Sequence, residues 1–299
     1  MQKRTKILDS LHDFFLSEKT KKKSESLIIK IAIASFIIHS LLIGLVDFKI
    51  LPISDTAGLL HNPIVAIYTP FSFILIYEVY LLVYYLPKSI SKYIGKQYEI
   101  ITLILIRRIF KDLSKIKFTP DWFEIKGNLQ FTYDIIGVII LFYLIFYFYK
   151  LNQKKEEKDK DERAVLSPEV ANFIETKKIM ATFLVPVLLV LATYSFIHWI
   201  YENFITVSEV VGSIRDINKI FFDDFFTVLI LTDVLLLLIS FFHTDQFSKV
   251  IRNSGFIIST ILIKLSFGIE GLLNTVMAVV AVLIGVLLFK IHNQYEKLE

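Results

Sequence analysis

The chain has 299 residues, of which 55% are hydrophobic and 21% charged, and its mean hydropathy is +0.60. This composition excludes an ordinary soluble domain of the same length and indicates membrane-spanning helices. The absence of cysteine excludes disulfides and thiolate metal sites, and a net charge of +4 is too small to indicate nucleic-acid binding.

Eight apolar segments follow one another along the chain: residues 27–46, 64–86, 98–114, 132–150, 179–201, 224–242, 254–267 and 272–291. A spanning helix needs about 20 apolar residues, and most of these segments reach or approach that length. The exceptions are 98–114, which carries two arginines, and 254–267, which is short and carries Lys264.

Charged amphipathic pieces at 11–22 and 169–178 precede the first and fifth segments. We predict that these two pieces lie as helices on the inner membrane surface.

The distribution of lysine and arginine indicates how the segments cross. If all eight cross with the N-terminus inside, the basic stretches 1–26, 87–97 and 151–178 all fall on the inner side. If 98–114 does not cross, every later loop changes side and the excess of basic residues on the inner side becomes much smaller. The positive-inside rule therefore favours eight crossings with both termini in the cytoplasm.

Several phrases occur twice in the same order. Residues 100–110 read IITLILIRRIF and 257–267 read IISTILIKLSF, while FSFILIYEVYLL at 71–82 returns as FTVLILTDVLLL at 226–237. An internal repeat of this kind sets the architecture. We predict an all-α polytopic membrane protein of eight helices, built as two four-helix repeats. The first repeat is 1–151, including the N-terminal amphipathic helix, the charged linker is 152–168, and the second repeat is 169–299. Four crossings per repeat make the repeats parallel.

The repeat aligns charged residues inside apolar segments. Glu78 aligns with Asp233, and Arg107 aligns with Lys264. Counting along each helix places all four near the middle of the membrane, so we predict the pairs Glu78–Arg107 and Asp233–Lys264. Two interpretations stay open. The pairs are structural contacts that dock helices, or they line a path for ions, protons or a small charged solute.

Other polar residues in the apolar segments have simpler interpretations. Arg108 has no basic counterpart in the second repeat, where Leu265 stands, so it binds an anion or a lipid phosphate, or it extends toward the membrane surface. His39 aligns with His198. Hydrogen-bonded histidines near the membrane surface are favoured here over ligands of haem or a metal.

Helix breakers suggest local irregularities. Pro70 and Pro186 fall inside apolar segments and are predicted to bend their helices. The segment 254–267 is short and bounded by glycines, which is typical either of a re-entrant helix or of a short tilted span.

Part of the first repeat resembles a known family. The run YEVYLLVYYLPKSISKYIGKQYEIITLILIRRIFKDL, followed by an apolar helix ending in FYKLNQ, resembles the phosphate-starvation-inducible protein E family of four-span bacterial inner-membrane proteins. Glu78 and either Arg107 or Arg108 match that pattern, and Lys264 stands in the arginine position of the second repeat. The resemblance implies a bacterial inner-membrane location and no particular activity.

The sequence contains no P-loop, GxSxG, HExxH or glycine-rich nucleotide turn, so we predict no enzyme, no cofactor and no metal site. The first functional hypothesis is a channel or transporter. The second is a non-enzymatic scaffold or a signalling or stress-response protein whose charge pairs are structural, and a membrane enzyme resting on the histidines is third. The predicted partners are the bilayer and anionic lipid headgroups. Association with further copies or with another membrane protein is left open.

Overall fold

The computed structural model describes residues 2–50, 63–113, 116, 119–161, 168–200, 217–241, 247–269, 271–296 and 298. All regular secondary structure in these ranges is helical, which confirms the predicted all-α class. The elements are α1 (Gln2–Leu16), α2 (Glu18–Asp47), the 3-10 helix η1 (Pro63–Ile67), α3 (Tyr68–Tyr85), α4 (Ile90–Leu113), α5 (Lys126–Asp161), α6 (Pro168–Ile200), α7 (Ile217–Phe241), α8 (Phe247–Phe267) and α9 (Leu272–Tyr295).

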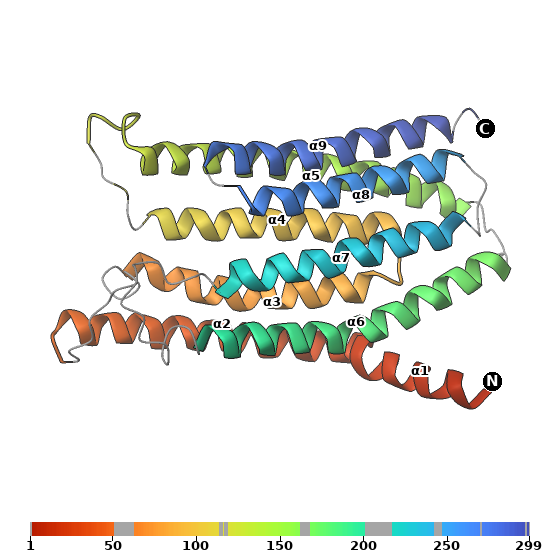
Figure 1. Cartoon of the computed structure of the whole chain (residues 1–299), viewed down its shortest axis with the longest axis horizontal. Coiled ribbons are helices and arrows are strands. Elements are labelled where there is room, and N and C mark those ends of the chain that lie inside the picture. The colour runs from red at the N-terminus through yellow and green to blue at the C-terminus, as the bar shows by residue number, and fades with distance from the viewer. Residues whose placement is uncertain are drawn as a thin grey trace.

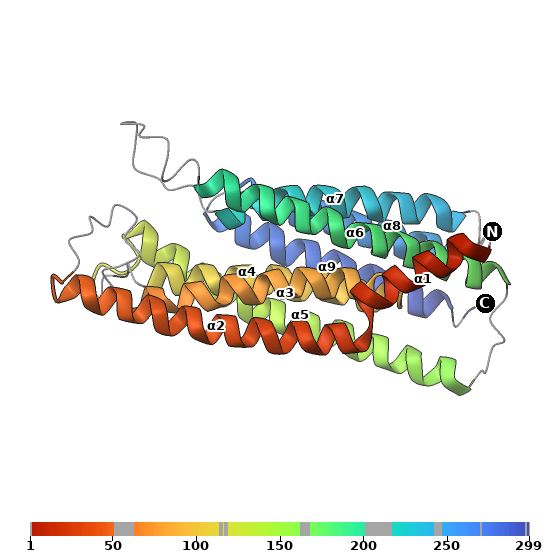
Figure 2. The same ribbon diagram turned by 90° about the horizontal axis from the view of Figure 1, so that it is seen from below.

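The long helices α2 to α9 lie side by side along one axis, and α1 extends from the end of the bundle (Figures 1 and 2). Helices α2 to α5 form the first repeat and α6 to α9 the second, and corresponding helices point in the same direction, as predicted for a parallel repeat. Helix α5 ends and α6 begins at the same end of the bundle, where both chain termini also lie (Figure 1). We call this end the linker end.

The two repeats meet through equivalent helices, because α5 packs on α9 and α4 packs on α8. Aromatic rings fill the space between them. The ring of Phe148 on α5 lies 5.2 Å from Tyr98 on α4, 6.0 Å from Phe256 on α8 and 5.1 Å from Phe289 on α9, measured between centroids. Such edge-on and tilted contacts are favourable for aromatic pairs. Helix α4, which carries the arginines that made its crossing doubtful, is therefore central.

Glycines allow α9 to approach its neighbours closely. A Cβ atom built on Gly285 of α9 would collide with the hydroxyl of Tyr98, and one built on Gly137 of α5 would collide with the Thr275 side chain. These two positions need a residue without a side chain, because the neighbouring helix occupies the space.

The helices extend beyond the apolar segments from which they were predicted. Helix α4 begins at Ile90 rather than at residue 98, and α8 begins at Phe247 rather than at 254, so α8 has 21 residues and is neither short nor broken. Helix α5 continues to Asp161, well into the predicted linker. Polar residues such as Lys, Gln and Glu are good helix formers, so a helix can continue past the end of its apolar segment.

Two further predictions are corrected by the positions at which α6 and α3 begin. Residues 169–178 are the first turns of α6 and not a separate surface helix. Pro70 lies in the first turn of α3, where its missing N–H group removes no helical hydrogen bond, whereas Pro186 does lie inside α6.

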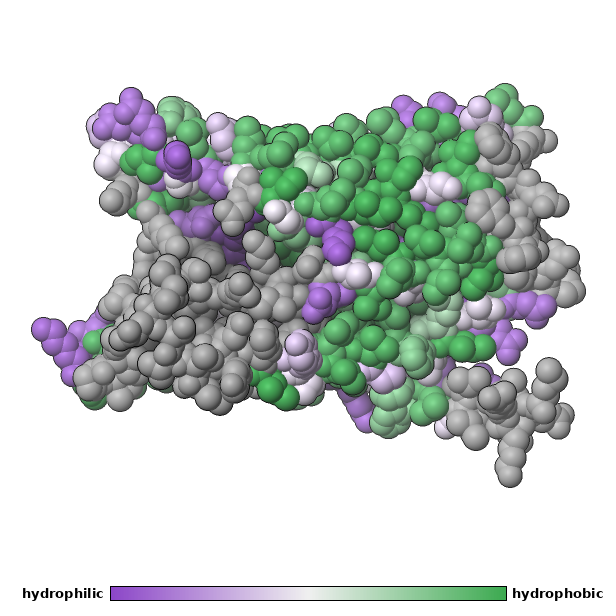
Figure 3. Space-filling model, viewed as in Figure 1, coloured by the Kyte–Doolittle hydropathy of each residue, from purple (hydrophilic) through white to green (hydrophobic). Residues whose placement is uncertain are grey.

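Within the described residues, four helical stretches are long and apolar enough to cross a membrane: Asp9–Asp47, Lys126–Gln153, Lys249–Phe267 and Leu272–Tyr295. A shorter apolar helix covers Thr69–Tyr85. The face in Figure 3 carries a broad region of hydrophobic side chains, with hydrophilic residues mostly toward the ends of the bundle. These features indicate a membrane protein, and the number of crossings stays a prediction.

Candidate functional site

The predicted pair Glu78–Arg107 is wrong. The Glu78 carboxylate on α3 lies 3.8 Å from the ammonium group of Lys96 on α4. Arg107 lies about three turns further along α4, where its guanidinium donates a hydrogen bond to the hydroxyl of Ser72 over 3.5 Å. The prediction failed because α4 begins at Ile90, so depth counted from residue 98 placed Arg107 too close to the linker end.

The predicted pair Asp233–Lys264 is wrong as well, although the repeat itself holds in three dimensions. The Lys264 ammonium on α8 donates to the hydroxyl of Thr227 on α7 over 2.5 Å. Thr227 occupies in the second repeat the position of Ser72 in the first, and Lys264 that of Arg107. Each repeat therefore places a base of its third helix against a hydroxyl of its second helix.

Asp233 instead belongs to a buried cluster that joins the two repeats. The Nε2 group of Gln97 on α4 donates to the Asp233 carboxylate over 3.1 Å, and its Oε1 accepts from the hydroxyl of Thr260 on α8 over 2.6 Å. Gln97 is fully buried, and Asp233 is 6% exposed. Among the residues that the structure describes, no basic side chain lies within ion-pair distance of Asp233.

The two aligned acids thus have different surroundings. Glu78 has the base Lys96, which also lies 2.5 Å from Glu99. In the second repeat the position of Lys96 is occupied by Asn253, a neutral residue. The second repeat therefore has no positive charge at the position of Lys96.

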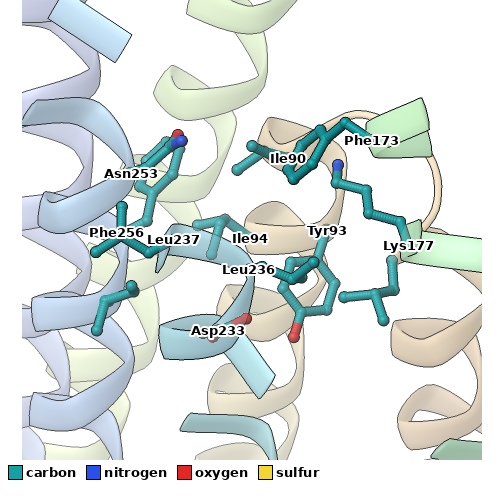
Figure 4. A pocket seen from close by; sticks show the side chains of 12 residues that line it. Ile90, Tyr93, Ile94, Phe173, Lys177, Asp233, Leu236, Leu237, Asn253 and Phe256 are labelled. Atoms are coloured by element: carbon teal, nitrogen blue, oxygen red, sulfur yellow. The ribbon is translucent and has the colours of Figure 1, made fainter. Parts of the chain in front are cut away.

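A cavity of about 30 Å³ lies beside Asp233, between α4, α6, α7 and α8 and toward the linker end (Figure 4). Its polar lining consists of Asp233, Tyr93, Lys177 and Asn253, and the remaining walls are apolar. The hydroxyl of Tyr93 is buried and points toward Asp233 (Figure 4), with which it interacts, although no protein atom meets it with good hydrogen-bond geometry. We call Asp233, Gln97, Thr260 and Tyr93 the Asp233 cluster.

Lys177 is the basic group of this cavity. It lies on α6, two residues before the apolar segment 179–201, and its ammonium donates to the carbonyl of Lys88 over 3.2 Å. Burial, together with the nearby charge of Arg252, lowers the pKa of Lys177 to about 8. The group is therefore less able to hold a positive charge than an exposed lysine.

Arg108, which the sequence left without a partner, forms an ion pair with Asp134 of α5. Its Nε and Nη2 atoms donate to the two carboxylate oxygens over 2.6 and 2.5 Å, and further bonds of 2.8 and 2.9 Å reach Asn274 and Thr275 of α9. Two-point pairing of this kind is strong and directional. We call these four residues the Arg108 network. Among the described residues, the anion that Arg108 meets is therefore a protein carboxylate, and a role with lipid phosphate stays a prediction.

Sequence reasoning missed Asp134. It stands near the start of an apolar segment, and a lone acid in such a segment was the signal that could have found it. The structure buries it completely, so the partner of Arg108 comes from its own repeat rather than from lipid.

His39 lies on α2, where its Nδ1 atom is 2.5 Å from the hydroxyl of Thr69. This contact agrees with the predicted hydrogen-bonded histidine. His198 belongs to α6, but its side chain lies outside the described residues, so the prediction of a hydrogen-bonded histidine stays untested at this position.

The described part of the bundle thus contains the Glu78–Lys96 pair, the Asp233 cluster and the Arg108 network. The second and third join the two repeats. Comparisons of this chain with protein-family models, with curated proteins and with solved structures find no match.

Proposed function

We propose that this chain is a multi-pass protein of a bacterial inner membrane, with eight crossings and both termini in the cytoplasm. The apolar helices, the concentration of lysine and arginine in the loops of one side, and the position of both termini at the linker end (Figure 1) support this location. The resemblance of the first repeat to the phosphate-starvation-inducible protein E family supports it as well.

We further propose that the protein moves protons across that membrane and that Asp233 is the group that takes them up. The observation that carries this proposal is a buried carboxylate, next to a cavity, that has no base within ion-pair distance among the described residues. An ionisable group inside a membrane is costly and commonly marks an ion or proton pathway. A cavity of about 30 Å³ favours protons over a larger solute, because it has room for about two water molecules.

The alternative function is a scaffold, and the Arg108 network favours it. Both oxygens of Asp134 and three nitrogens of Arg108 have hydrogen-bond partners, and the contacts tie the first repeat to α9. A satisfied network of this kind holds helices in one arrangement. A scaffold needs such contacts and no proton pathway.

Proton flux into liposomes discriminates the two functions. Purified protein is reconstituted into liposomes that contain a pH-sensitive dye, and a potassium gradient with valinomycin imposes a membrane potential. The wild-type protein should acidify or alkalinise the interior according to the sign of the potential. Asp233→Asn, which keeps the shape of the side chain but cannot ionise, should reduce the flux to that of empty liposomes.

Glu78→Gln is the matched control, because it makes the same chemical change at the aligned position of the first repeat. Since Glu78 is paired with Lys96, this variant should retain most of the flux. A wild-type flux no greater than that of empty liposomes would overturn proton transport and leave the scaffold. Equal loss in both variants would show that Asp233 has no special role.

A further inference from the structure

The cavity beside Asp233 is built to hold water. A buried site holds water when it has about 10–15 Å³ of room per molecule and two to four polar partners. This cavity has about 30 Å³, and the side chains of Asp233, Tyr93, Asn253 and Lys177 supply the partners.

The strongest sign of a ligand is the hydroxyl of Tyr93. It is buried and aimed at Asp233 (Figure 4), with which it interacts, yet no protein atom meets it with good hydrogen-bond geometry. Leaving a buried hydroxyl unsatisfied costs about 1–3 kcal/mol, so such groups are normally paired with protein or with water. A water molecule in the cavity satisfies this hydroxyl together with Asp233.

The position of the cavity indicates where the water comes from. Its walls are formed by the first turns of α4 and α8, the last turns of α7 and the N-terminal third of α6, all of which lie toward the linker end. Ile90 is the first residue of α4, and Leu237 is four residues from the end of α7.

We infer that this cavity is a water-filled access path from the linker end to Asp233, in which Tyr93 and Asn253 hold the water molecules and Lys177 stands at the mouth. Its role in carrying protons rests on the proposed function, whereas its occupation by water does not. Tyr93 is a positioning residue, because its hydroxyl orients the water next to the acid.

The chain has no cysteine, so single cysteines report water access without background. Asn253→Cys and Leu236→Cys place a thiol in the cavity wall, and Leu235→Cys places one on the exposed apolar surface of the same helix as the matched control. Each variant in liposomes is treated with Ag⁺, a small water-soluble ion that reacts with thiolate. The thiols that have not reacted are then counted by labelling after denaturation. The variant Leu298→Cys, whose position is exposed, reports which way the protein is oriented in the liposome membrane.

The two cavity cysteines should react at least about tenfold faster than Leu235→Cys, because a thiol ionises only where water reaches it. The reaction should be fast when Ag⁺ is on the side of Leu298. Cavity cysteines that react no faster than the control, or only from the opposite side, overturn the inference.

Tyr93→Phe then tests the link to proton movement, because it removes only the hydroxyl. Proton flux should fall several-fold while Asp233 is unchanged, and the apparent melting temperature should stay close to wild type. Fast thiol reaction without any proton flux would refute the proposed function and retain the water path. Proton flux with unreactive cavity thiols would refute the path and retain the function. Unchanged flux in Tyr93→Phe would remove Tyr93 from the path.

Discussion

Gln97 of the first repeat donates a hydrogen bond to Asp233 of the second repeat over 3.1 Å, inside a bundle that is apolar around it. An amide suits this place because it can donate and accept at once. The N–H group of Gln97 donates a hydrogen bond to the carboxylate, and its carbonyl oxygen accepts a hydrogen bond from the Thr260 hydroxyl. One side chain therefore satisfies two polar groups of the other repeat.

Replacing Gln97 with leucine should destabilise the fold. The change removes the Gln97 donor from the buried Asp233 carboxylate, so we expect a loss of about 1–3 kcal/mol in the free energy of unfolding. The measurement is denaturant unfolding in mixed micelles. Thr102→Val is the control on the same helix, because the buried Thr102 hydroxyl bonds only to the Tyr98 carbonyl of α4 itself. Equal losses in both variants would contradict a role of Gln97 between the repeats.

Removing one charge of the Arg108–Asp134 pair should lower the free energy of unfolding more than removing both charges. Asp134→Ala leaves Arg108 without its carboxylate, and we expect a loss of about 3–5 kcal/mol. The double variant Arg108→Met, Asp134→Leu should recover much of that loss, because neither charge is then left unpaired. The same unfolding experiment gives both values. Additive losses from the two single variants would show that the pair is not coupled.

Glycine 285 should not tolerate a methyl group. In Gly285→Ala the new carbon meets the Tyr98 hydroxyl and comes within 3.3 Å of the Ser259 hydroxyl, so we expect a loss of about 1–3 kcal/mol from overpacking. Gly44→Ala in α2 is the matched control, since a Cβ there has no neighbour within 4 Å. Alanine is the better helix former by up to about 1 kcal/mol, so the control should be neutral or stabilising. A neutral Gly285→Ala would mean that α9 lies further from α4.

Because the pKa of Lys177 is lowered, the free energy of unfolding should rise with pH in alkaline solution. Burial and Arg252 lower its pKa to about 8, below the usual value of 10.5 for a lysine in the unfolded chain. Between these two pH values the unfolded chain binds a proton that the folded protein has lost, so the free energy of unfolding rises as pH increases from 8 to 10.5. Below pH 8 both states carry the proton and this contribution is constant.

The full effect corresponds to at most about 3 kcal/mol at 1.36 kcal/mol per pKa unit. Apparent melting temperatures in detergent at pH 7 and pH 10 measure it, and Lys177→Met should lose the rise while being more stable than wild type at pH 7. A rise of the same size in Lys177→Met would assign it to another group.

Much of the architecture was predictable because hydrophobic length and repetition are local properties of the chain. The apolar segments, their order and the parallel direction of the two repeats follow from runs such as 100–110 and 257–267, and the structure confirms the all-helical class. The helix ends were not predictable in the same way. Ile90 and Phe247 begin their helices among polar residues, which a hydropathy pattern does not separate from a loop.

The candidate site was predictable in part. Asp233, Glu78 and Arg108 were selected as charged residues of apolar segments, and in the structure each has a different neighbour from the one expected. Because a shift of a few residues along a helix moves a side chain by several ångströms and turns it to another face, an error in a helix end changes its partner. Asp134 could have been selected as a lone acid in an apolar segment, whereas Gln97 could not, because its importance depends on the helix that faces it.

The amino-acid sequence by itself determined that the chain is a helical, predominantly apolar protein of two repeats, since burial of apolar surface and the length of each segment require nothing beyond the local chain. Only the tertiary structure decided which acid meets which base, that Asp233 has the amide of Gln97 in place of a lysine, and that a cavity lies beside it. These relations depend on the register and rotation of helices from different repeats, and packing between distant segments sets both.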